Sequence, residues 1–269
     1  MLVCSSAASR HKSLSTIGFA RGSTYVKYPF SVCADQGNAP RHRKAANTNC
    51  SWWRAARSRL VVKALLERAS RRFARLVTDA VVARPGAWRL LRPLFRRQWD
   101  QLAPTWEQLR RPDTFDPYVA GLNTLPEPPK RALDVGTGTG GGALEIATRF
   151  PSTEVVGVDF AVAMMAIAAS KVTPSLAGRV SFRQADASSL PFGDGEFDLV
   201  AHNNMIPFFD EIARVLRPGG HALFAYSSGA ETPIYVPPER IRAELERRGF
   251  SDFAYSSPGR GTVLVARKR

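Results

Sequence analysis

Cysteine is scarce in this sequence of 269 residues and is confined to one end of it. The three cysteines, Cys4, Cys33 and Cys50, fall within the first fifty residues and show no metal-ligand spacing. Disulfides and a structural zinc ion are therefore not expected, and we expect no metal in the protein. No apolar run approaches the roughly 20 residues that a membrane-spanning helix needs.

Acidic residues are also scarce, but only in the first half of the chain. Residues 1–131 hold 24 Lys and Arg against 8 Asp and Glu, a net charge of +16. Residues 132–269 hold 14 against 15, a net charge of −1. The basic excess therefore belongs to the first half and carries no information about the chemistry of the second.

Residues 1–50 contain one acidic residue, Asp35, and are rich in serine and basic residues. Without a sustained apolar period, this composition predicts a disordered segment. It also fits an organellar transit peptide and, equally, an upstream extension with no role. We expect a cytoplasmic protein, free or at a membrane surface, with an organelle as the alternative if residues 1–50 are a transit peptide. A secretory signal is disfavoured because no apolar central region precedes a cleavage site.

Two basic amphipathic helices are predicted in residues 51–97. Residues 52–82 are good helix formers without Gly or Pro, Pro85 and Gly86 end this helix, and a second helix covers residues 87–97. We favour an apolar stripe that packs on the main domain, because most amphipathic helices are half-buried. The sharper alternative is peripheral contact with anionic membrane lipid. Nucleic-acid binding is the weakest alternative, since no aromatic interleaving accompanies the charge.

A glycine-rich turn in residues 131–147 indicates a ligand site. Residues 132–135 are an apolar run typical of a buried parallel strand, and residues 144–150 are predicted to be helical. Between them Gly136, Gly138 and Gly140 remove side chains, so that a ligand can lie on the peptide groups at the helix N-terminus. This spacing alone would also fit an NAD-dependent oxidoreductase.

Three acidic residues favour a different nucleotide ligand. Asp134 stands two residues before the first glycine, where a fixed carboxylate suits a cationic ligand better than a pyrophosphate. A second strand ends in Asp159, which could bind both ribose hydroxyls. A third ends in Asp186, and further strands follow at residues 196–201 and 221–226, so strands and helices alternate as in a parallel sheet covered on both faces.

At these motifs the sequence, from about Phe95 to its C-terminus, resembles the class I S-adenosylmethionine-dependent methyltransferases, especially the group related to the menaquinone and ubiquinone methyltransferases. The resemblance implies an α/β, Rossmann-like, doubly wound sheet of seven strands, the last antiparallel. It places the methyltransferase domain at residues 98–269, after the extension 1–50 and the basic helical segment 51–97. The implied cofactor is S-adenosylmethionine.

The resemblance also implies where the cofactor binds. Asp134 and the glycine turn would surround its methionine half, Asp159 would bind the ribose, and Phe160 would pack on the adenine. Asp186 would accept from the adenine amino group. The expected cofactor-binding residues are Asp134, Gly136, Thr137, Gly138, Gly140, Asp159, Phe160, Asp186, Ala187 and Asn203.

The acceptor is expected at residues 202–210, which follow the fourth strand, because open α/β sheets bind ligands at this edge. No inserted substrate domain fits the sequence, so the lid must come from residues 87–130, and such a modest cover suits a small or amphipathic acceptor. Trp99 and Trp106 stand seven residues apart, on one face if the helix continues, although Pro104 predicts a break. The expected substrate-pocket residues are Trp99, Trp106, Tyr118, Asn204 and Phe208.

His202 is the candidate general base, from its residue type and its place beside the acceptor loop. Methyl transfer does not require a base, since alignment of donor and acceptor removes much of the barrier. We therefore expect a methyltransferase that acts on a small molecule. The alternatives are a cofactor-binding protein without transferase activity and a nucleic-acid methyltransferase. The second is suggested by residues 204–208, which partly resemble an Asn-Pro-Pro-aromatic motif.

Overall fold

The computed structural model describes residues 51–269, with the side chains of residues 51–64, 66, 67 and 94 outside the description. The predicted disordered or targeting segment 1–50, with its three cysteines, lies outside the described residues. Residues 51–269 form one compact unit. The predicted boundary at residue 97 thus does not separate two compact units.

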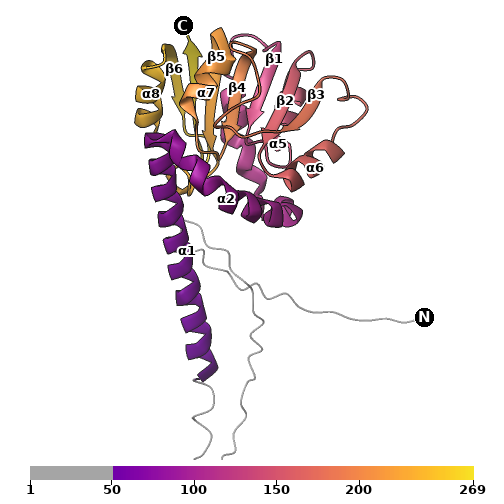
Figure 1. Ribbon diagram of the computed structural model, residues 1–269. Coiled ribbons are helices and arrows are strands. Elements are labelled where there is room, and N and C mark those ends of the chain that lie inside the picture. Colours follow the sequence, from indigo (N-terminus) through magenta and orange to yellow (C-terminus); the bar gives the residue numbers. More distant parts are fainter. Residues whose placement is uncertain (1–50) are drawn as a thin grey trace, which may run out of the picture. The chain divides into compact units, whose positions relative to one another are not determined.

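A seven-stranded sheet organises this unit. Its strands are β1 (Arg131–Val135), β2 (Glu154–Asp159), β3 (Val180–Gln184), β4 (Phe197–Asn203), β5 (Leu216–Tyr226), β6 (Phe250–Ser256) and β7 (Thr262–Lys268). Their spatial order is β3-β2-β1-β4-β5-β7-β6 (Figure 1). The first five run parallel, and β7 is antiparallel to both β5 and β6. The α/β, doubly wound fold with an antiparallel last strand is therefore confirmed.

The helices are α1 (Ser51–Ala83), α2 (Trp88–Leu102), α3 (Trp106–Leu109), α4 (Asp116–Leu122), α5 (Gly141–Arg149), α6 (Val162–Ser170), α7 (Phe209–Val215) and α8 (Pro238–Glu246). The helices predicted at residues 52–82 and 87–97 correspond to α1 and α2. The break predicted at Pro104 is confirmed, since a short 3-10 turn, Ala103–Thr105, separates α2 from α3. No helix in the described part of the chain is both long and apolar enough to cross a membrane.

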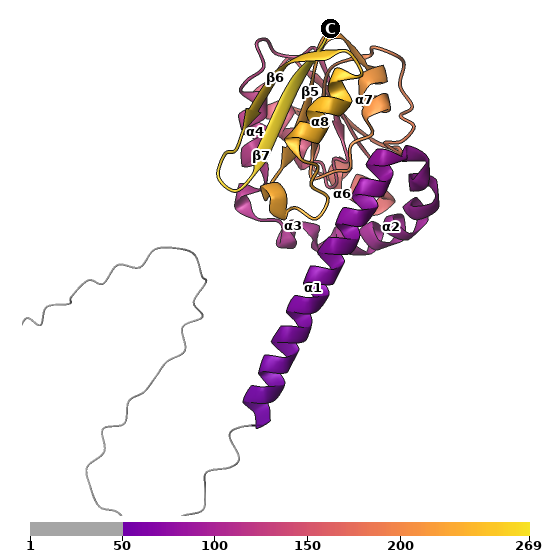
Figure 2. The same ribbon diagram turned by 90° about the vertical axis from the view of Figure 1, so that its left-hand side faces the viewer.

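Two cores lie on opposite faces of the sheet, because successive strand residues point to opposite sides. On β1, Ala132 belongs to the core that α4 and α5 cover. Leu133 and Val135 belong to the core that contains residues of α7 and α8. Figure 2 shows α4 on one side of the β6–β7 edge and α7 and α8 on the other. The residue that follows Leu133, Asp134, therefore points toward α4 and α5.

The last turns of α1 pack on the main domain. Val77, Val81 and Val82 are buried in the same core as α7 and α8. Arg75 donates to the backbone carbonyl oxygen of Ala230 at 2.7 Å. At this end of α1 the structure therefore agrees with the favoured interpretation of residues 51–97, an apolar stripe that packs on the main domain.

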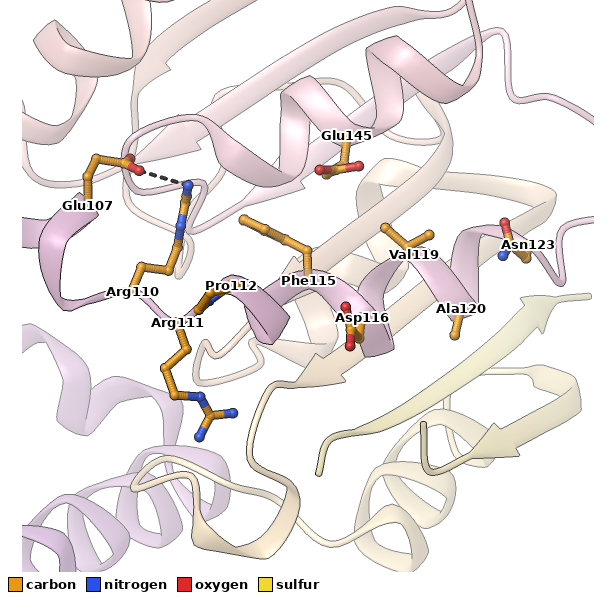
Figure 3. Close-up of a pocket in the computed structure, with 10 residues that line it drawn as sticks. All are labelled: Glu107, Arg110, Arg111, Pro112, Phe115, Asp116, Val119, Ala120, Asn123 and Glu145. Carbon is orange, nitrogen blue, oxygen red and sulfur yellow. Dashed lines mark ion pairs between the residues drawn. The ribbon is translucent and has the colours of Figure 1, made fainter. Parts of the chain in front are cut away.

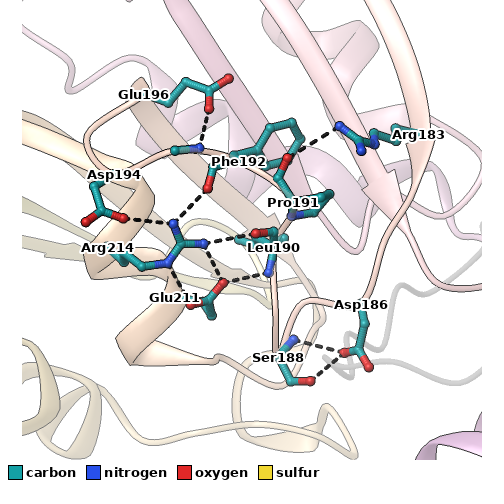
Figure 4. Close-up of polar contacts among 11 residues, drawn as sticks. Arg183, Asp186, Ser188, Leu190, Pro191, Phe192, Asp194, Glu196, Glu211 and Arg214 are labelled. Atoms are coloured by element: carbon teal, nitrogen blue, oxygen red, sulfur yellow. Dashed lines mark hydrogen bonds and ion pairs between the residues drawn. The ribbon is translucent and has the colours of Figure 1, made fainter.

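An arginine holds the loop between β3 and β4 (Figure 4). Arg214 of α7 donates to the carbonyl oxygens of Leu190 at 2.9 Å and Phe192 at 2.7 Å. It also forms a two-pronged ion pair with Glu211, 2.8 Å for each prong. Glu211 in turn accepts the backbone N–H of Leu190 at 2.6 Å. Asp186 lies near the start of this loop, so the network helps to place a predicted ligand-binding carboxylate.

Candidate active site

A cavity of about 170 Å³ lies at the carboxyl ends of β1, β2 and β4, beneath the lid segment of residues 87–130. Every predicted cofactor residue except Gly140 lines it, and so does every predicted substrate-pocket residue except Tyr118. His202 does not line it. Its walls also include residues that the sequence did not single out, namely Trp88, Phe95, Arg110, Thr114, Phe115, Met205, Ile206 and Ile234.

Asp134 is a buried carboxylate at the end of β1, with a relative exposure of 2%. Its Oδ1 accepts a 2.8 Å hydrogen bond from the hydroxyl of Tyr118 on α4, whereas Oδ2 has no hydrogen-bond partner in the described part of the chain. Burial raises the pKa of Asp134 to about 6, even though the neighbouring hydroxyls of Thr137 and Tyr118 act to lower it. A cation placed at Oδ2 would relieve this desolvation.

Tyr118 was predicted to line the substrate pocket, and the structure places it elsewhere. It is fully buried in the core between α4 and the sheet. Because its hydroxyl bonds the carboxylate of Asp134 on the side of α4, it orients a cavity residue without reaching the cavity.

The glycine turn brings bare backbone to the cavity. Gly136 has φ of 69°, and a Cβ there would lie 2.6 Å from the sulfur of Met205. The hydroxyl of Thr137 is buried, and no residue of the described range 51–269 is its hydrogen-bond partner. Gly140 also has positive φ, 86°, but a Cβ there would meet the ring of Phe182 at 2.7 Å. Its contribution is therefore conformational: it is the residue from which α5 begins.

Asp159 and Phe160 stand together at the end of β2. Asp159 Oδ2 accepts the backbone N–H of Gly138 at 3.0 Å, and its Oδ1 accepts that of Ala161 at 2.9 Å. Each oxygen keeps a lone pair for a ligand hydroxyl. Burial raises the pKa of Asp159, although these backbone hydrogen bonds act to lower it. The ring of Phe160 meets that of Trp88 edge to face at 5.6 Å.

The end of β4 places three polar side chains in different surroundings. Asn203 points to the cavity; its amide donates to the carbonyl oxygen of Thr114 at 3.1 Å, and its buried Oδ1 has no partner. Asn204 has φ of 55° and exchanges two 2.9 Å hydrogen bonds with Ser227. These bonds tie the loop after β4 to the loop after β5.

His202 lies on the opposite face of β4 from Asn203. It is 1% exposed, and its ring centroid lies 4.7 Å from that of Phe224. Neither ring nitrogen has a hydrogen-bond partner among the residues that the structure describes. Burial lowers its pKa to about 3, so the imidazole is neutral. This placement does not favour the general base that we expected, because strand alternation directs the side chain into the core and away from the cavity.

Aromatic residues of the lid cover the cavity. The rings of Trp99 and Trp106 meet at 5.1 Å although the turn at Pro104 interrupts the helix between them, and both line the cavity. Trp106 also lies close to the glycine turn, since a Cβ on Gly138 would be 3.7 Å from its ring nitrogen. An electron-rich indole face is suited to a cation.

Arg110 is one of the residues that line a second pocket beside the cavity (Figure 3). It lies between the cavity and a groove of about 560 Å³ along α4 and α5, and it lines both. It forms a 2.7 Å ion pair with Glu107 and stacks over the ring of Phe115 at 5.1 Å. Lys171 also bonds Glu107, at 2.6 Å, and the carbonyl oxygen of Thr139, at 2.8 Å. These contacts tie the lid to the glycine turn.

No group of three or more His, Cys, Asp or Glu side chains within residues 51–269 is arranged to hold a metal ion.

Comparison with known proteins gives consistent matches. A family model described as a methyltransferase domain matches residues 132–220. The demethylmenaquinone methyltransferase of Thermus thermophilus is 39% identical over 134 residues, which cover 45% of this chain and 60% of that protein. A ubiquinone/menaquinone biosynthesis C-methyltransferase of Geobacter sulfurreducens is 43% identical over 114 residues, 39% of this chain and 44% of that protein. The chain thus covers less than two thirds of the length of these two relatives.

A solved structure shares the fold. The SAM-dependent methyltransferase of Aquifex aeolicus superposes with a TM-score of 0.52 at 20% identity, over 61% of this chain and 97% of that one.

Proposed function

We propose that this chain transfers a methyl group to a quinone-type small molecule. The premise is that it belongs to the class I S-adenosylmethionine-dependent methyltransferases related to the quinone methyltransferases. One observation carries the proposal. Three side chains that line one cavity each have a buried oxygen atom with no hydrogen-bond partner among the described residues: Asp134 Oδ2, Thr137 Oγ1 and Asn203 Oδ1. Buried acceptors of this kind require a donor-rich partner, and a cationic ligand with an ammonium group supplies one.

The same residues fit S-adenosylmethionine along its length. Asp134 and Asn203 would hold its ammonium group, and Asp159 would hold its ribose hydroxyls through the lone pairs left on each oxygen. Phe160 would pack on the adenine, beside Asp186 and the amide of Ala187. The cofactor, when bound, supplies a methyl group on a positively charged sulfur.

The chain's own residues would then act by alignment. Trp106 would present an aromatic face near the sulfonium, and the glycine turn and Asp134 would fix the donor. The other side of the cavity is apolar and is lined by Met205, Ile206 and Ile234. Such a wall suits a flat, apolar ring and excludes water from the reacting atoms. We assign no general base, in keeping with the buried position of His202.

Binding and turnover test this proposal separately. Calorimetric titration should show tighter binding of S-adenosylhomocysteine than of NAD. A labelled methyl donor should then transfer its label to a reduced demethylated naphthoquinone. Binding without transfer to any quinol, phenol or amine would favour a cofactor-binding protein. Tighter NAD binding would favour an oxidoreductase, and transfer to oligonucleotides but not to quinols would favour a nucleic-acid methyltransferase.

Peripheral contact with an anionic membrane is a second part of the proposal. Leu65, Phe73 and Leu76 are 56%, 55% and 68% exposed, and their spacing of eight and three residues puts them on one stripe of α1. On α2, Leu90 is 85% exposed. Residues 51–97 hold 13 Lys and Arg against 2 Asp and Glu, a net charge of +11. Exposed apolar residues among basic ones support a helix that lies on anionic lipid, at the surface of a cytoplasmic or organellar membrane.

Vesicle co-sedimentation tests the membrane proposal. Binding should require anionic lipid and weaken as salt rises toward 1 M, where the screening length is roughly 3 Å. Arg71→Gln/Arg72→Gln should weaken it by up to about tenfold, from about 1 kcal/mol for each residue near the surface. Arg149→Gln/Arg269→Gln removes the same charge from exposed sites outside α1 and α2 and should have little effect. Equal binding by neutral vesicles, or equal effects of the two double variants, would refute the proposal.

A further inference from the structure

The geometry points to Trp88 and Arg92 of α2 as positioning residues that aim the carboxylate of Asp186 at adenine. The N-terminal helical segment would then be part of the cofactor site. This inference rests on the proposed function, because it takes an adenosine ligand for granted. Both residues precede the matched region of residues 132–220, so the family match assigns them no role.

Four donors converge on Asp186. Its Oδ1 accepts from the indole N–H of Trp88 at 3.0 Å, from the backbone N–H of Ser188 at 2.9 Å and from the Ser188 hydroxyl at 2.8 Å. Its Oδ2 accepts from Arg92 alone, at 2.8 Å. A carboxylate oxygen has about two lone-pair sites, so Oδ1 is saturated. Oδ2 is therefore the oxygen with capacity left for the amino group of adenine.

These contacts decide the direction of Oδ2. The terminal torsion of an aspartate side chain has a broad distribution, so the backbone alone does not fix it. Trp88 and Ser188 hold Oδ1 and Arg92 holds Oδ2, so the carboxylate is fixed in the place where Asp186 lines the cavity. Trp88 itself is 7% exposed and packs against Phe95, Phe160 and Phe208, with ring centroids 5.6 to 5.9 Å apart. A tryptophan packed in this way has little freedom to rotate.

The charge state of Asp186 supports the same conclusion. Burial acts to raise its pKa, but the bonds from Ser188, Arg92 and Trp88 outweigh burial, and the pKa is lowered. The carboxylate is then ionised and can only accept hydrogen bonds. Adenine offers an amino donor at this position, whereas hypoxanthine offers a carbonyl oxygen that the carboxylate would repel. The contact with Trp88 and Arg92 would therefore set base specificity as well as affinity.

The test compares two ligands by calorimetry on the full chain: S-adenosylhomocysteine and its deaminated analogue, S-inosylhomocysteine. The wild-type protein should prefer the adenine ligand by at least about tenfold, because one charged hydrogen bond is lost in the analogue. Trp88→Phe removes the N–H donor and keeps an aromatic ring, and Arg92→Gln removes the charge. Each should weaken adenine binding about tenfold and leave hypoxanthine binding nearly unchanged, so that the preference shrinks.

Arg89→Gln is the matched control, because Arg89 is an exposed neighbour on the same helix and should keep the wild-type preference. Thermal unfolding checks that each variant is folded. If Trp88→Phe does not fold, Arg92→Gln decides the question, since the Arg92 side chain is 52% exposed and can be changed without opening the core. A folded variant with the wild-type preference for adenine would overturn the inference. A wild-type protein that binds neither ligand would instead refute the proposed function.

Discussion

Asparagine in place of Asp134 should remove a pH dependence of cofactor binding. Burial raises the pKa of this carboxyl to about 6, and its Oδ2 has no hydrogen-bond partner within the described residues. A cationic ligand at Oδ2 binds the ionised carboxylate and lowers that pKa. Binding must then release protons in acid, so cofactor affinity should fall as the pH drops below about 6 and level off above about 7.

The size of the effect follows from the pKa. With a value near 6, about nine tenths of the free protein is ionised at pH 7 and about one tenth at pH 5, so the Kd for S-adenosylhomocysteine should rise about tenfold between them. Asp134→Asn should bind more weakly at pH 7 and lose most of this dependence. Calorimetry at pH 5, 6 and 7, in buffers of different ionisation enthalpy, measures both the affinity and the protons released.

Two controls test whether the pH dependence comes from Asp134. Asp159 also has a raised pKa, so Asp159→Asn shows how much of the dependence comes from the second carboxyl. The folded protein binds the Asp134 proton more tightly than the unfolded chain does, so above about pH 6 the ionised carboxylate destabilises the fold by about 3 kcal/mol. Asp134→Asn should therefore be no less stable than wild type at pH 7. A tenfold dependence that persists in Asp134→Asn, or a flat wild-type profile, would refute the assignment of Asp134 to the cation.

Three other predictions test the site and its support. Arg214→Lys should lower the free energy of unfolding by about 1–3 kcal/mol, measured by urea denaturation, because an ammonium cannot reproduce the planar fork that bonds two carbonyls and Glu211. Below about pH 6.5 the free energy of unfolding of the wild type should fall relative to that of His202→Leu by about 1.4 kcal/mol per pH unit. The reason is that burial lowers the histidine pKa to about 3, so that only the unfolded chain binds the extra proton in this range. Parallel plots of unfolding free energy against pH for the two proteins would contradict this. Asp159→Ala should weaken cofactor binding about tenfold or more, and unchanged affinity would mean that the ribose lies elsewhere.

Residue order alone determined the sheet and the edge at which the cavity lies. Apolar runs that each end in a polar residue, at Asp134, Asp159 and Asn203, predict parallel strands whose carboxyl ends meet. Positive φ at Gly136 is likewise local, because a turn this tight between strand and helix favours glycine wherever it occurs. These signals are carried by neighbours in the chain, and for that reason they could be read without a structure.

Which side chains face the cavity was decided only by the tertiary structure. His202 and Asn203 are adjacent in sequence, yet the pleat of β4 directs one into the core and the other into the cavity. Tyr118 belongs to the lid segment, as predicted, but it contacts Asp134 from α4 and does not line the cavity. Trp88 reaches Asp186 across 98 residues of sequence, and no local pattern encodes a contact of that separation. The chain fixes which residues are available, whereas packing of the two helical layers on the sheet selects those that meet.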